Sequence, residues 1–415
     1  MKNRLILIAL MLVTAMPASP YPIDGYWTTG ISRLLRLQLV LDGSIKETAP
    51  IKGAQKSILD IALNLTNSRG DSLETLPKPD AAMQKSITSI FPNLDESYSL
   101  SVLEITEGKP MRLAQLQPKR GYQPGSVGKL AVICGLFAEL QSLYPDSFEK
   151  RQELLKTTMI RAGRWAIPNE HTVPIFDPKT RKFEKRILKE SDVFSLYEWA
   201  DHMLSVSSNG AASVVWREAV LMRAFGEDYP VSEEVATEYF KTTPKSKLTE
   251  IGMAVVNDPL RAAGITEDEW RLGSLFTSEA KKLLPGSGGS TATTQGMLKF
   301  MVALERGKLV DTASSLEIKR LMYMTDRRIR YAGAAVLKDA AVYFKSGSLY
   351  GCTPEEGYIC EKYKGNKQNY MNSVAIVEHP DGTTYLVALM SNVLKKNSSS
   401  DHYGLASQID RIVWK

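Results

Sequence analysis

Alternating apolar and polar positions predict β-strands near both ends of the chain. Residues 99–105 alternate as a half-buried strand does, and the turn-forming Glu107-Gly108-Lys109 leads into residues 111–116, which we expect to return beside it. Asp381-Gly382 predicts a tight hairpin between the last two of three further strand-like runs. Those three runs are residues 340–346, 371–378 and 384–390.

Apolar residues at helical spacing fill most of the chain between these strands. The pattern becomes helical over residues 127–143, after Pro124-Gly125-Ser126, and stays mostly helical over residues 151–285. Two stretches of that block, around residues 168–189 and 226–247, are polar, and we predict that they are loops.

The order of these elements predicts one sheet assembled from both chain ends. Helices are expected at residues 81–90, before the first strand, and at residues 402–414, after the last. An all-helical unit of about residues 145–335 is then inserted between the second and third strands. The cleft between two such units is the default place for a binding site.

The first twenty residues are typical of a secretory signal peptide. Lys2 and Arg4 precede an apolar run at residues 5–13, and small residues and helix breakers follow at residues 15–20. The apolar run is too short to span a bilayer, and no later stretch reaches eighteen apolar residues. We therefore expect a secreted, periplasmic protein whose mature chain has no transmembrane segment.

Composition and charge exclude several classes of protein. Of 415 residues, 43% are hydrophobic and 24% are charged, as in an ordinary globular chain. The net charge of +6 is too small for a dedicated nucleic-acid binder, so no nucleic-acid partner is expected. The four histidines have no metal-ligating spacing and no phosphate-binding loop is present, so we expect no metal and no cofactor. Nothing in the sequence specifies an oligomeric state.

The three cysteines are too few for a disulfide framework. In an oxidising compartment Cys352 and Cys360 could close a loop of their own, and two free thiols are the alternative. Cys134 lies in an apolar run and is expected to be buried.

Ser126-Val127-Gly128-Lys129 is the first motif that could carry chemistry. Residues three apart share a helix face, so Lys129 Nζ can approach Ser126 Oγ. A lysine whose pKa is lowered can take the proton of a serine and make it a nucleophile. In isolation, a capping serine and a solvated lysine explain the same residues.

Two further motifs have the same ambiguity when each is taken alone. In Ser207-Ser208-Asn209, Ser207 could hydrogen-bond between two lysines and relay a proton to a leaving group. Asn209 could hold a substrate amide, although an ordinary helix cap would look alike. In Lys345-Ser346-Gly347-Ser348, Lys345 and Ser346 could bind a carboxylate, and Gly347 permits close approach of a ligand. The Ser348 N–H could then bind an oxyanion together with that of Ser126.

Together the three motifs resemble the S-x-x-K, S-x-N and K-[ST]-G signature of the penicillin-recognising serine hydrolases. The resemblance is closest to the class A β-lactamase-like family and covers about residues 80–415, while residues 21–79 form an extension of unassigned role. The Thr-rich run at residues 290–297 and residues 328–337 also look like that family. The resemblance implies an α/β (α+β) fold of the β-lactamase/D,D-peptidase type, an antiparallel sheet flanked by helices plus an all-helical lobe.

One departure from the family bears on function. Class A β-lactamases carry a glutamate in an E-x-x-L-N loop that activates the deacylating water. Residues 274–285 occupy the corresponding region without that motif, and Glu279 is nearby but out of register. Glu279 is therefore a weak candidate for the deacylation base, and a plain surface carboxylate is the alternative.

The resemblance implies a serine hydrolase that is acylated at Ser126, with Lys129 as base and Ser207 as proton relay, and that hydrolyses β-lactams. Two alternatives share its fold. One is a D-Ala-D-Ala carboxypeptidase, or penicillin-binding protein, that acts on peptidoglycan stem peptides. The other is a non-catalytic periplasmic binding protein, because a fold does not guarantee an activity.

Overall fold

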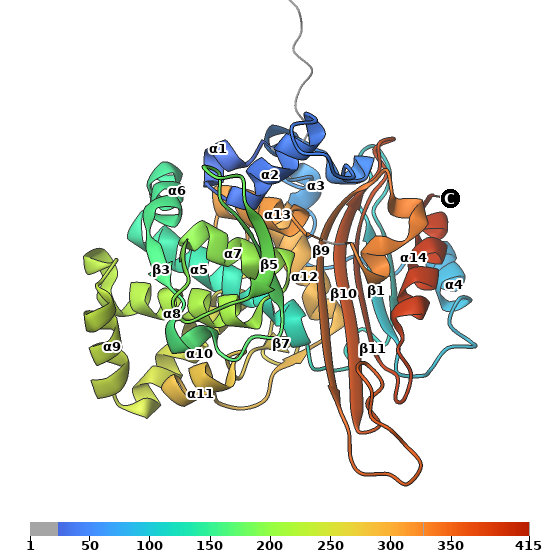
Figure 1. Cartoon of the computed structure of the whole chain (residues 1–415). Helices are drawn as coiled ribbons and strands as arrows, with labels where there is room; N and C mark the ends of the chain where they lie inside the picture. Colours follow the sequence, from blue (N-terminus) through green and yellow to red (C-terminus); the bar gives the residue numbers. More distant parts are fainter. Residues whose placement is uncertain (1–23, 327, 415) are drawn as a thin grey trace, which may run out of the picture.

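The structure is a computed structural model that describes residues 24–326 and 328–414, so the predicted signal peptide lies outside the described residues. Its centre is a five-stranded antiparallel sheet with the strand order β2-β1-β11-β10-β9, assembled from both ends of the chain as predicted (Figure 1). The strands are β1 (Ser99–Glu104), β2 (Arg112–Leu116), β9 (Ala341–Gly351), β10 (Gln368–Glu378) and β11 (Thr384–Asn392). The expected fold class is confirmed.

Helices cover both faces of this sheet. On one face, α4 (Ala81–Thr88) and α14 (Ser399–Trp414) bury Ile87 and Ile409 against Val102 and Val387. On the other face lie α12 (Thr294–Glu305) and α13 (Thr312–Tyr323) (Figure 1). Burying apolar side chains between layers is the main favourable term in forming such a sandwich.

The helical lobe is built around α5 (Lys129–Leu143), which carries the first motif at its start. Between Gly125 and Leu143 the chain is long and apolar enough to cross a membrane, but 72% of that segment is buried inside the protein as a core helix. The helices around it are α6 (Phe148–Thr157), α7 (Leu196–Ser205), α8 (Asn209–Phe225), α9 (Glu233–Thr242), α10 (Lys245–Ala262) and α11 (Ser278–Leu283).

Two predictions about loops in this lobe are wrong. The polar stretch at residues 168–189 contains a hairpin of β4 (Thr172–Phe176) and β5 (Phe183–Ile187), in which Val173 is fully buried. The stretch at residues 226–247 contains α9, whose first turn is capped by the Ser232 side chain. A serine cap followed by acidic residues is a helix-start signal, and the polar composition of the segment obscured it.

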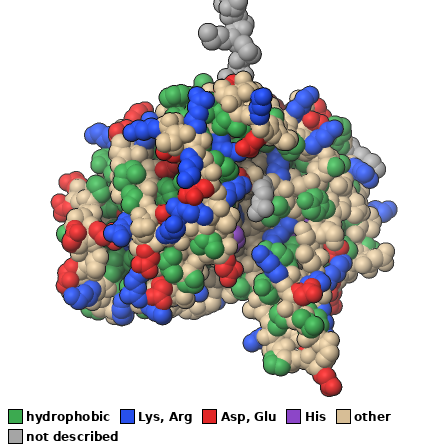
Figure 2. All heavy atoms as spheres, viewed as in Figure 1, with side chains coloured by type: hydrophobic (Ala, Val, Ile, Leu, Met, Phe, Trp, Pro, Cys, Tyr) green, Lys and Arg blue, Asp and Glu red, His purple; other side chains and the backbone are tan. Residues whose placement is uncertain are grey.

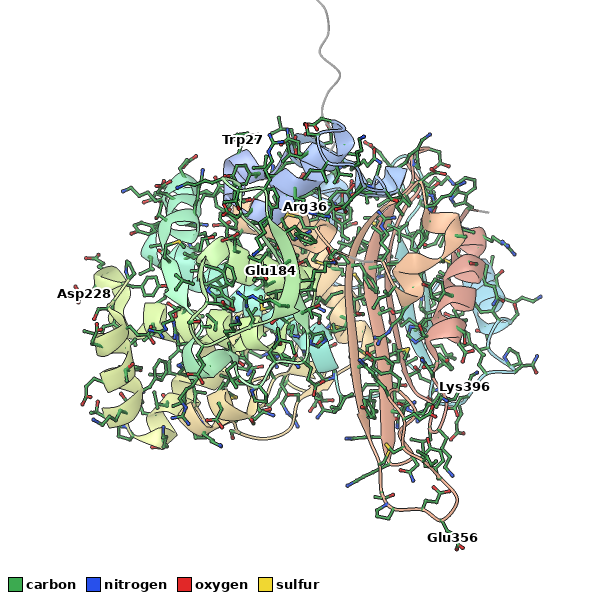
Figure 3. All side chains as sticks on the ribbon, viewed as in Figure 1. Trp27, Arg36, Glu184, Asp228, Glu356 and Lys396 are labelled. Carbon is green, nitrogen blue, oxygen red and sulfur yellow. A yellow bond between two sulfur atoms is a disulfide. The ribbon has the colours of Figure 1, made fainter. Side chains whose placement is uncertain are left out.

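The N-terminal extension lies across the top of both lobes in Figure 1. Its helices are α1 (Tyr26–Thr29), α2 (Ser32–Leu41) and α3 (Ser68–Asp71), whereas residues 54–65 form only short 3-10 turns despite their apolar spacing. Arg33 makes a buried ion pair with Asp201 of α7, and Lys56 pairs with Glu378 of β10 at 2.7 Å. Arg36, labelled in Figure 3, stacks on Phe183 of the β4–β5 hairpin. The extension is therefore packed against both lobes.

Positive and negative side chains are interspersed over the face shown in Figure 2. This distribution accords with the modest net charge of +6.

Candidate active site

Ser126 lies in a 3-10 turn, Gly125–Gly128, that runs directly into α5. Gly125 has φ +53, and a Cβ there would lie 2.8 Å from the backbone nitrogen of Ser348. A side chain at this position would therefore be strained and would clash with β9. The glycine lets the nucleophile turn pack directly against the strand that carries the third motif.

Lys129, the first residue of α5, is fully buried and joins the first two motifs. Its Nζ lies 2.9 Å from Ser126 Oγ, 2.7 Å from Asn209 Oδ1 and 2.6 Å from the carbonyl oxygen of Ser207. Among the described residues, no carboxylate is within ion-pair distance of it. Burial, followed by the charge of Lys345, holds the pKa of Lys129 well below its ordinary value.

Ser207 lies between two lysines, as the sequence predicted. Its Oγ is 3.3 Å from Lys129 Nζ and accepts a 2.8 Å hydrogen bond from Lys345 Nζ. The residue has φ +63, an uncommon conformation for a side chain larger than glycine. The next residue, Ser208, caps α8, and Asn169 Oδ1 accepts hydrogen bonds from both Ser208 Oγ and the Gly210 N–H. Strain of this kind persists where the surrounding contacts hold the turn in place.

Lys345 to Ser348 lie within β9, the edge strand of the sheet, and not at its end. Burial, together with the charge of Arg330, lowers the pKa of Lys345 to about 7. At Gly347 a Cβ would lie 2.2 Å from the Pro124 carbonyl oxygen and 3.0 Å from the Ser126 nitrogen. The backbone segments that carry the two predicted oxyanion donors, at Ser126 and Ser348, are therefore in direct contact.

Two buried residues that the sequence analysis did not single out stabilise the contact between the Ser126 turn and β9. Asn372 of β10 pairs with Gly347 in register, and its Nδ2 donates to the carbonyls of Gln123 at 2.9 Å and Pro124 at 3.1 Å. Arg330 Nη1 donates to the Gly347 carbonyl at 2.8 Å. Asn372 is one of several polar residues in β10, and its partners are far away in the sequence, so no local signal singles it out.

The remaining side of Lys129 is apolar. The ring centre of Phe276 lies 5.0 Å from Lys129 Nζ, and Leu272 packs against Gly128. Both residues precede α11, and Phe276 belongs to the segment that corresponds to the family's glutamate loop. This side of the site therefore presents hydrocarbon to the lysine.

Glu279 does not fit the role of deacylation base. Its carboxylate, in the first turn of α11, forms ion pairs with Arg164 and Lys282. Hydrogen bonds from Lys282 and Arg164 also hold its pKa below the ordinary value, which makes it a weaker base.

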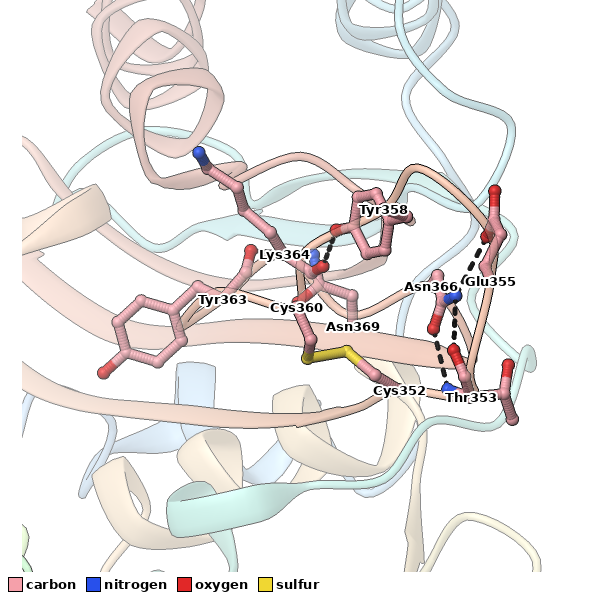
Figure 4. Close-up of a disulfide and its surroundings, with 9 residues drawn as sticks. All are labelled: Cys352, Thr353, Glu355, Tyr358, Cys360, Tyr363, Lys364, Asn366 and Asn369. Carbon is pink, nitrogen blue, oxygen red and sulfur yellow. Dashed lines mark hydrogen bonds between the residues drawn. A yellow bond between two sulfur atoms is a disulfide. The ribbon is translucent and has the colours of Figure 1, made fainter.

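The predicted pairing of Cys352 and Cys360 is confirmed by a disulfide in the loop between β9 and β10 (Figure 4). The loop protrudes beyond the sheet, with Glu356 at its tip in Figure 3. Its Tyr363 ring lies 5.3 Å from the Arg330 guanidinium, so the loop contacts the group that holds Gly347. Cys134 is a buried free thiol, as expected.

No group of three His, Cys, Asp or Glu side chains that could hold a metal ion occurs in residues 24–326 or 328–414. The site described above consists of hydroxyl, amine, amide and backbone groups. These groups suit acyl transfer by a serine nucleophile.

The sequence profile of the β-lactamase enzyme family matches residues 82–415. The chain therefore belongs to this family, which accords with the resemblance to the penicillin-recognising serine hydrolases. No curated protein matches the sequence.

Solved structures of the same fold come from both β-lactamases and penicillin-binding proteins. The chain is similar to PBP-A, with 14% identity and a TM-score of 0.51 over 82% of this chain and 98% of the other. It is similar to a class A β-lactamase from Bacteroides cellulosilyticus, with 15% identity and a TM-score of 0.50 over 82% and 98%. For the TLA-1 extended-spectrum β-lactamase the identity is 12% and the TM-score 0.53 over 81% and 100%. At these identities the likeness concerns the fold.

Proposed function

We propose that this protein is an exported serine hydrolase that is acylated at Ser126 by β-lactams and hydrolyses their amide bond. The observation that carries the proposal is the environment of Lys129, a buried amine 2.9 Å from Ser126 Oγ with no carboxylate partner among the described residues. A neutral Lys129 amine has two N–H bonds, and these donate to Asn209 Oδ1 and to the Ser207 carbonyl. The remaining lone pair then faces the Ser126 hydroxyl.

In the proposed acylation step, Ser126 Oγ attacks the lactam carbonyl while its proton passes to Lys129 Nζ. The carbonyl π electrons move to oxygen, and the N–H groups of Ser126 and Ser348 stabilise that oxyanion. As the oxyanion collapses, the C–N bond breaks and the leaving nitrogen takes a proton. Ser207 delivers it and is reprotonated by Lys129, because its Oγ lies 3.3 Å from Lys129 Nζ.

The same geometry suggests how the substrate is held. Lys345 Nζ and the Ser346 hydroxyl, on β9, attract the substrate carboxylate, and the Asn209 Nδ2 group donates to the carbonyl of the substrate amide. The burial of Lys345, which is 2% exposed, strengthens its attraction for an anion that enters the cleft.

A second candidate function is a D,D-peptidase that acts on the D-Ala-D-Ala ends of peptidoglycan stem peptides. It uses the same acylation steps, because a β-lactam resembles an acyl-D-Ala-D-Ala terminus. The observation that favours it is Phe276, which faces Lys129 at 5.0 Å where a β-lactamase needs a base for the deacylating water. The two functions differ in how fast the acyl-enzyme is hydrolysed.

The decisive experiment follows the intact mass of the purified protein after mixing with benzylpenicillin. An adduct that forms and clears within seconds, with steady drug turnover, supports the β-lactamase. A persistent adduct contradicts it and supports the peptidase. Absence of any adduct across a panel of β-lactams contradicts both and supports the binding protein without catalysis. Ser126→Ala is the matched control, and it must abolish the adduct.

Export is proposed from the charge and hydrophobicity of residues 1–20. Expression of the full chain in a Gram-negative host, followed by N-terminal sequencing of the periplasmic protein, tests it. A chain that keeps Met1 and stays in the cytoplasm contradicts the proposal.

A further inference from the structure

A second cavity, of about 520 Å³, opens in the helical lobe between α9, α11 and the 3-10 turn η4 (Gly163–Ala166). This volume lies within the range of small-molecule sites, ~300–1,000 Å³. The hollow beside Ser207 and Lys345 is much smaller, at about 60 Å³. In Figure 1, α9 stands at the outer edge of the helical lobe, on the side away from the sheet. We call this cavity the α9 pocket; no residue of the three motifs lines it.

The lining of the α9 pocket is rich in cationic side chains. Five cationic and two acidic residues line it: Arg161, Arg164, Arg217, Lys241, Lys245, Glu190 and Glu233. Arg164 is paired with Glu279, and Arg217 with the buried Glu218 and with Glu233. Arg161 and Lys245 donate instead to backbone carbonyls, at 3.2 Å and 2.7 Å, and neither has a carboxylate partner among the described residues. Lys241 makes only an exposed pair with Glu238 at 3.5 Å, so part of the positive charge is left for an anion.

The inner wall of the α9 pocket is apolar. Trp165 and Phe240 lie edge to face with their ring centres 4.6 Å apart, and Ala236 and Leu283 extend this surface. Gly163 leaves room at the mouth, since the nearest atom to a Cβ placed there is Glu233 Oε1 at 3.9 Å. Rings and aliphatic carbon beneath a cationic rim suit a ligand with an apolar body and an anionic end.

The turn η4 separates the α9 pocket from the active site and contacts both. Trp165 lines the pocket, and its carbonyl accepts a 2.7 Å hydrogen bond from Thr277, which follows Phe276. On the other side of η4, the Ala166 carbonyl would lie 2.5 Å from a Cβ at Gly210, next to Asn209. A ligand in the pocket therefore rests on the turn that supports the second motif.

We propose that the α9 pocket binds an organic anion, a carboxylate on an aromatic or branched aliphatic body. The carboxylate lies at the rim with Lys245, Lys241 and Arg161, and the apolar body lies on Trp165 and Phe240. This site is separate from Ser126 and does not depend on the function proposed for it.

The test is calorimetric titration of the full chain with 2-naphthylacetate and, for comparison, with its neutral amide. Saturable binding of the acid is expected, with the amide at least tenfold weaker. In Lys241→Glu/Lys245→Glu the dissociation constant of the acid rises at least tenfold. Thr237→Trp, which adds an indole at an exposed position of the pocket lining, is expected to block both compounds without removing a contact.

A double change of two exposed lysines elsewhere, Lys179→Glu/Lys362→Glu, gives the same charge difference and must leave the affinity unchanged. Absence of binding, equal affinity for acid and amide, or binding that survives both pocket variants overturns the proposal. Loss of binding in Lys345→Met alone also overturns the proposal, because that result would show that 2-naphthylacetate binds beside Ser207 and Lys345. Labelling of Ser126 by a fluorescent penicillin is measured on every variant, so failure at either site is seen separately.

Discussion

Two lysines within residues 24–326 and 328–414 are fully shielded from solvent, and they differ in whether a carboxylate lies beside them. Lys129 lies in the catalytic cleft among Ser126, Ser207 and Asn209, none of which is a carboxylate. Lys319 of α13 lies behind the sheet, 2.6 Å from Glu305 and 2.7 Å from Glu378.

The carboxylates decide the charge of each lysine. Burial by itself lowers the pKa of Lys319, but the charges of Glu305 and Glu378 outweigh it and hold that pKa above its ordinary value. Lys129 has no such compensation, and burial and the charge of Lys345 lower its pKa. The same side chain is thus a charged ammonium at one place and, in the proposed mechanism, an amine base at the other.

The largest expected effect comes from removing each amine in turn. Lys129→Met takes away the proposed general base, so acylation by a fluorescent penicillin should slow by about 10²–10⁴-fold, while the melting temperature does not fall. Lys319→Met leaves the buried Glu305 without a cation, while Glu378 keeps Lys56, and should cost about 3–5 kcal/mol of unfolding free energy. The folded fraction of Lys319→Met should keep the native acylation rate. Slow acylation in Lys319→Met, or native acylation in Lys129→Met, contradicts the comparison.

Phe276→Glu places a carboxylate beside Lys129, as Glu305 and Glu378 lie beside Lys319. A carboxylate placed about where the ring now lies, 5.0 Å from Nζ, should raise the pKa of Lys129 because it favours the charged amine. Acylation at neutral pH should then slow at least tenfold, and the rising limb of its pH profile should move to higher pH. Phe276→Gln, of similar size without the charge, should leave the profile in place. Equal pH profiles for the two variants would refute the claim that the pKa of Lys129 is low because no carboxylate lies beside it.

The sequence predicted most of the sheet and the meeting of the three motifs, because these depend on local pattern and chain order. The strand patterns at residues 371–378 and 384–390 lie within β10 and β11. It did not predict the β4–β5 hairpin, whose residues Phe183–Ile187 are largely exposed and are positioned by pairing with β4. It also did not predict that Phe276 faces Lys129, since the two are brought together only by the packing of distant segments.

A change at Asn372 tests whether acylation depends on how firmly the turn before Ser126 is held against β10. Asn372→Ala removes both hydrogen bonds to the turn before Ser126, and acylation should slow about tenfold, less than the 10²–10³ expected for losing an oxyanion donor outright. The pH midpoint should not move, because Lys129 keeps its surroundings. Asn369 of the same strand is the matched control, since it is also buried and donates to the carbonyls of Tyr363, Val393 and Lys396. If Asn369→Ala slows acylation equally, the effect is one of general stability.

The smallest effect concerns Lys345, whose pKa is lowered to about 7 by burial and by the charge of Arg330. Its ammonium is present below pH 7 and is lost as the pH rises through 7, so attraction for a substrate carboxylate should weaken in that direction. The expected loss is about 1 kcal/mol, the usual net contribution of one hydrogen bond, or roughly fivefold in the second-order acylation constant. Benzylpenicillin and its methyl ester should be compared between pH 6 and 9, because both share the pH dependence of Lys129 and only the acid carries the carboxylate. Their ratio should fall with a midpoint near pH 7. A ratio that is flat across this range would mean that Lys345 does not bind the substrate carboxylate and serves Ser207 alone.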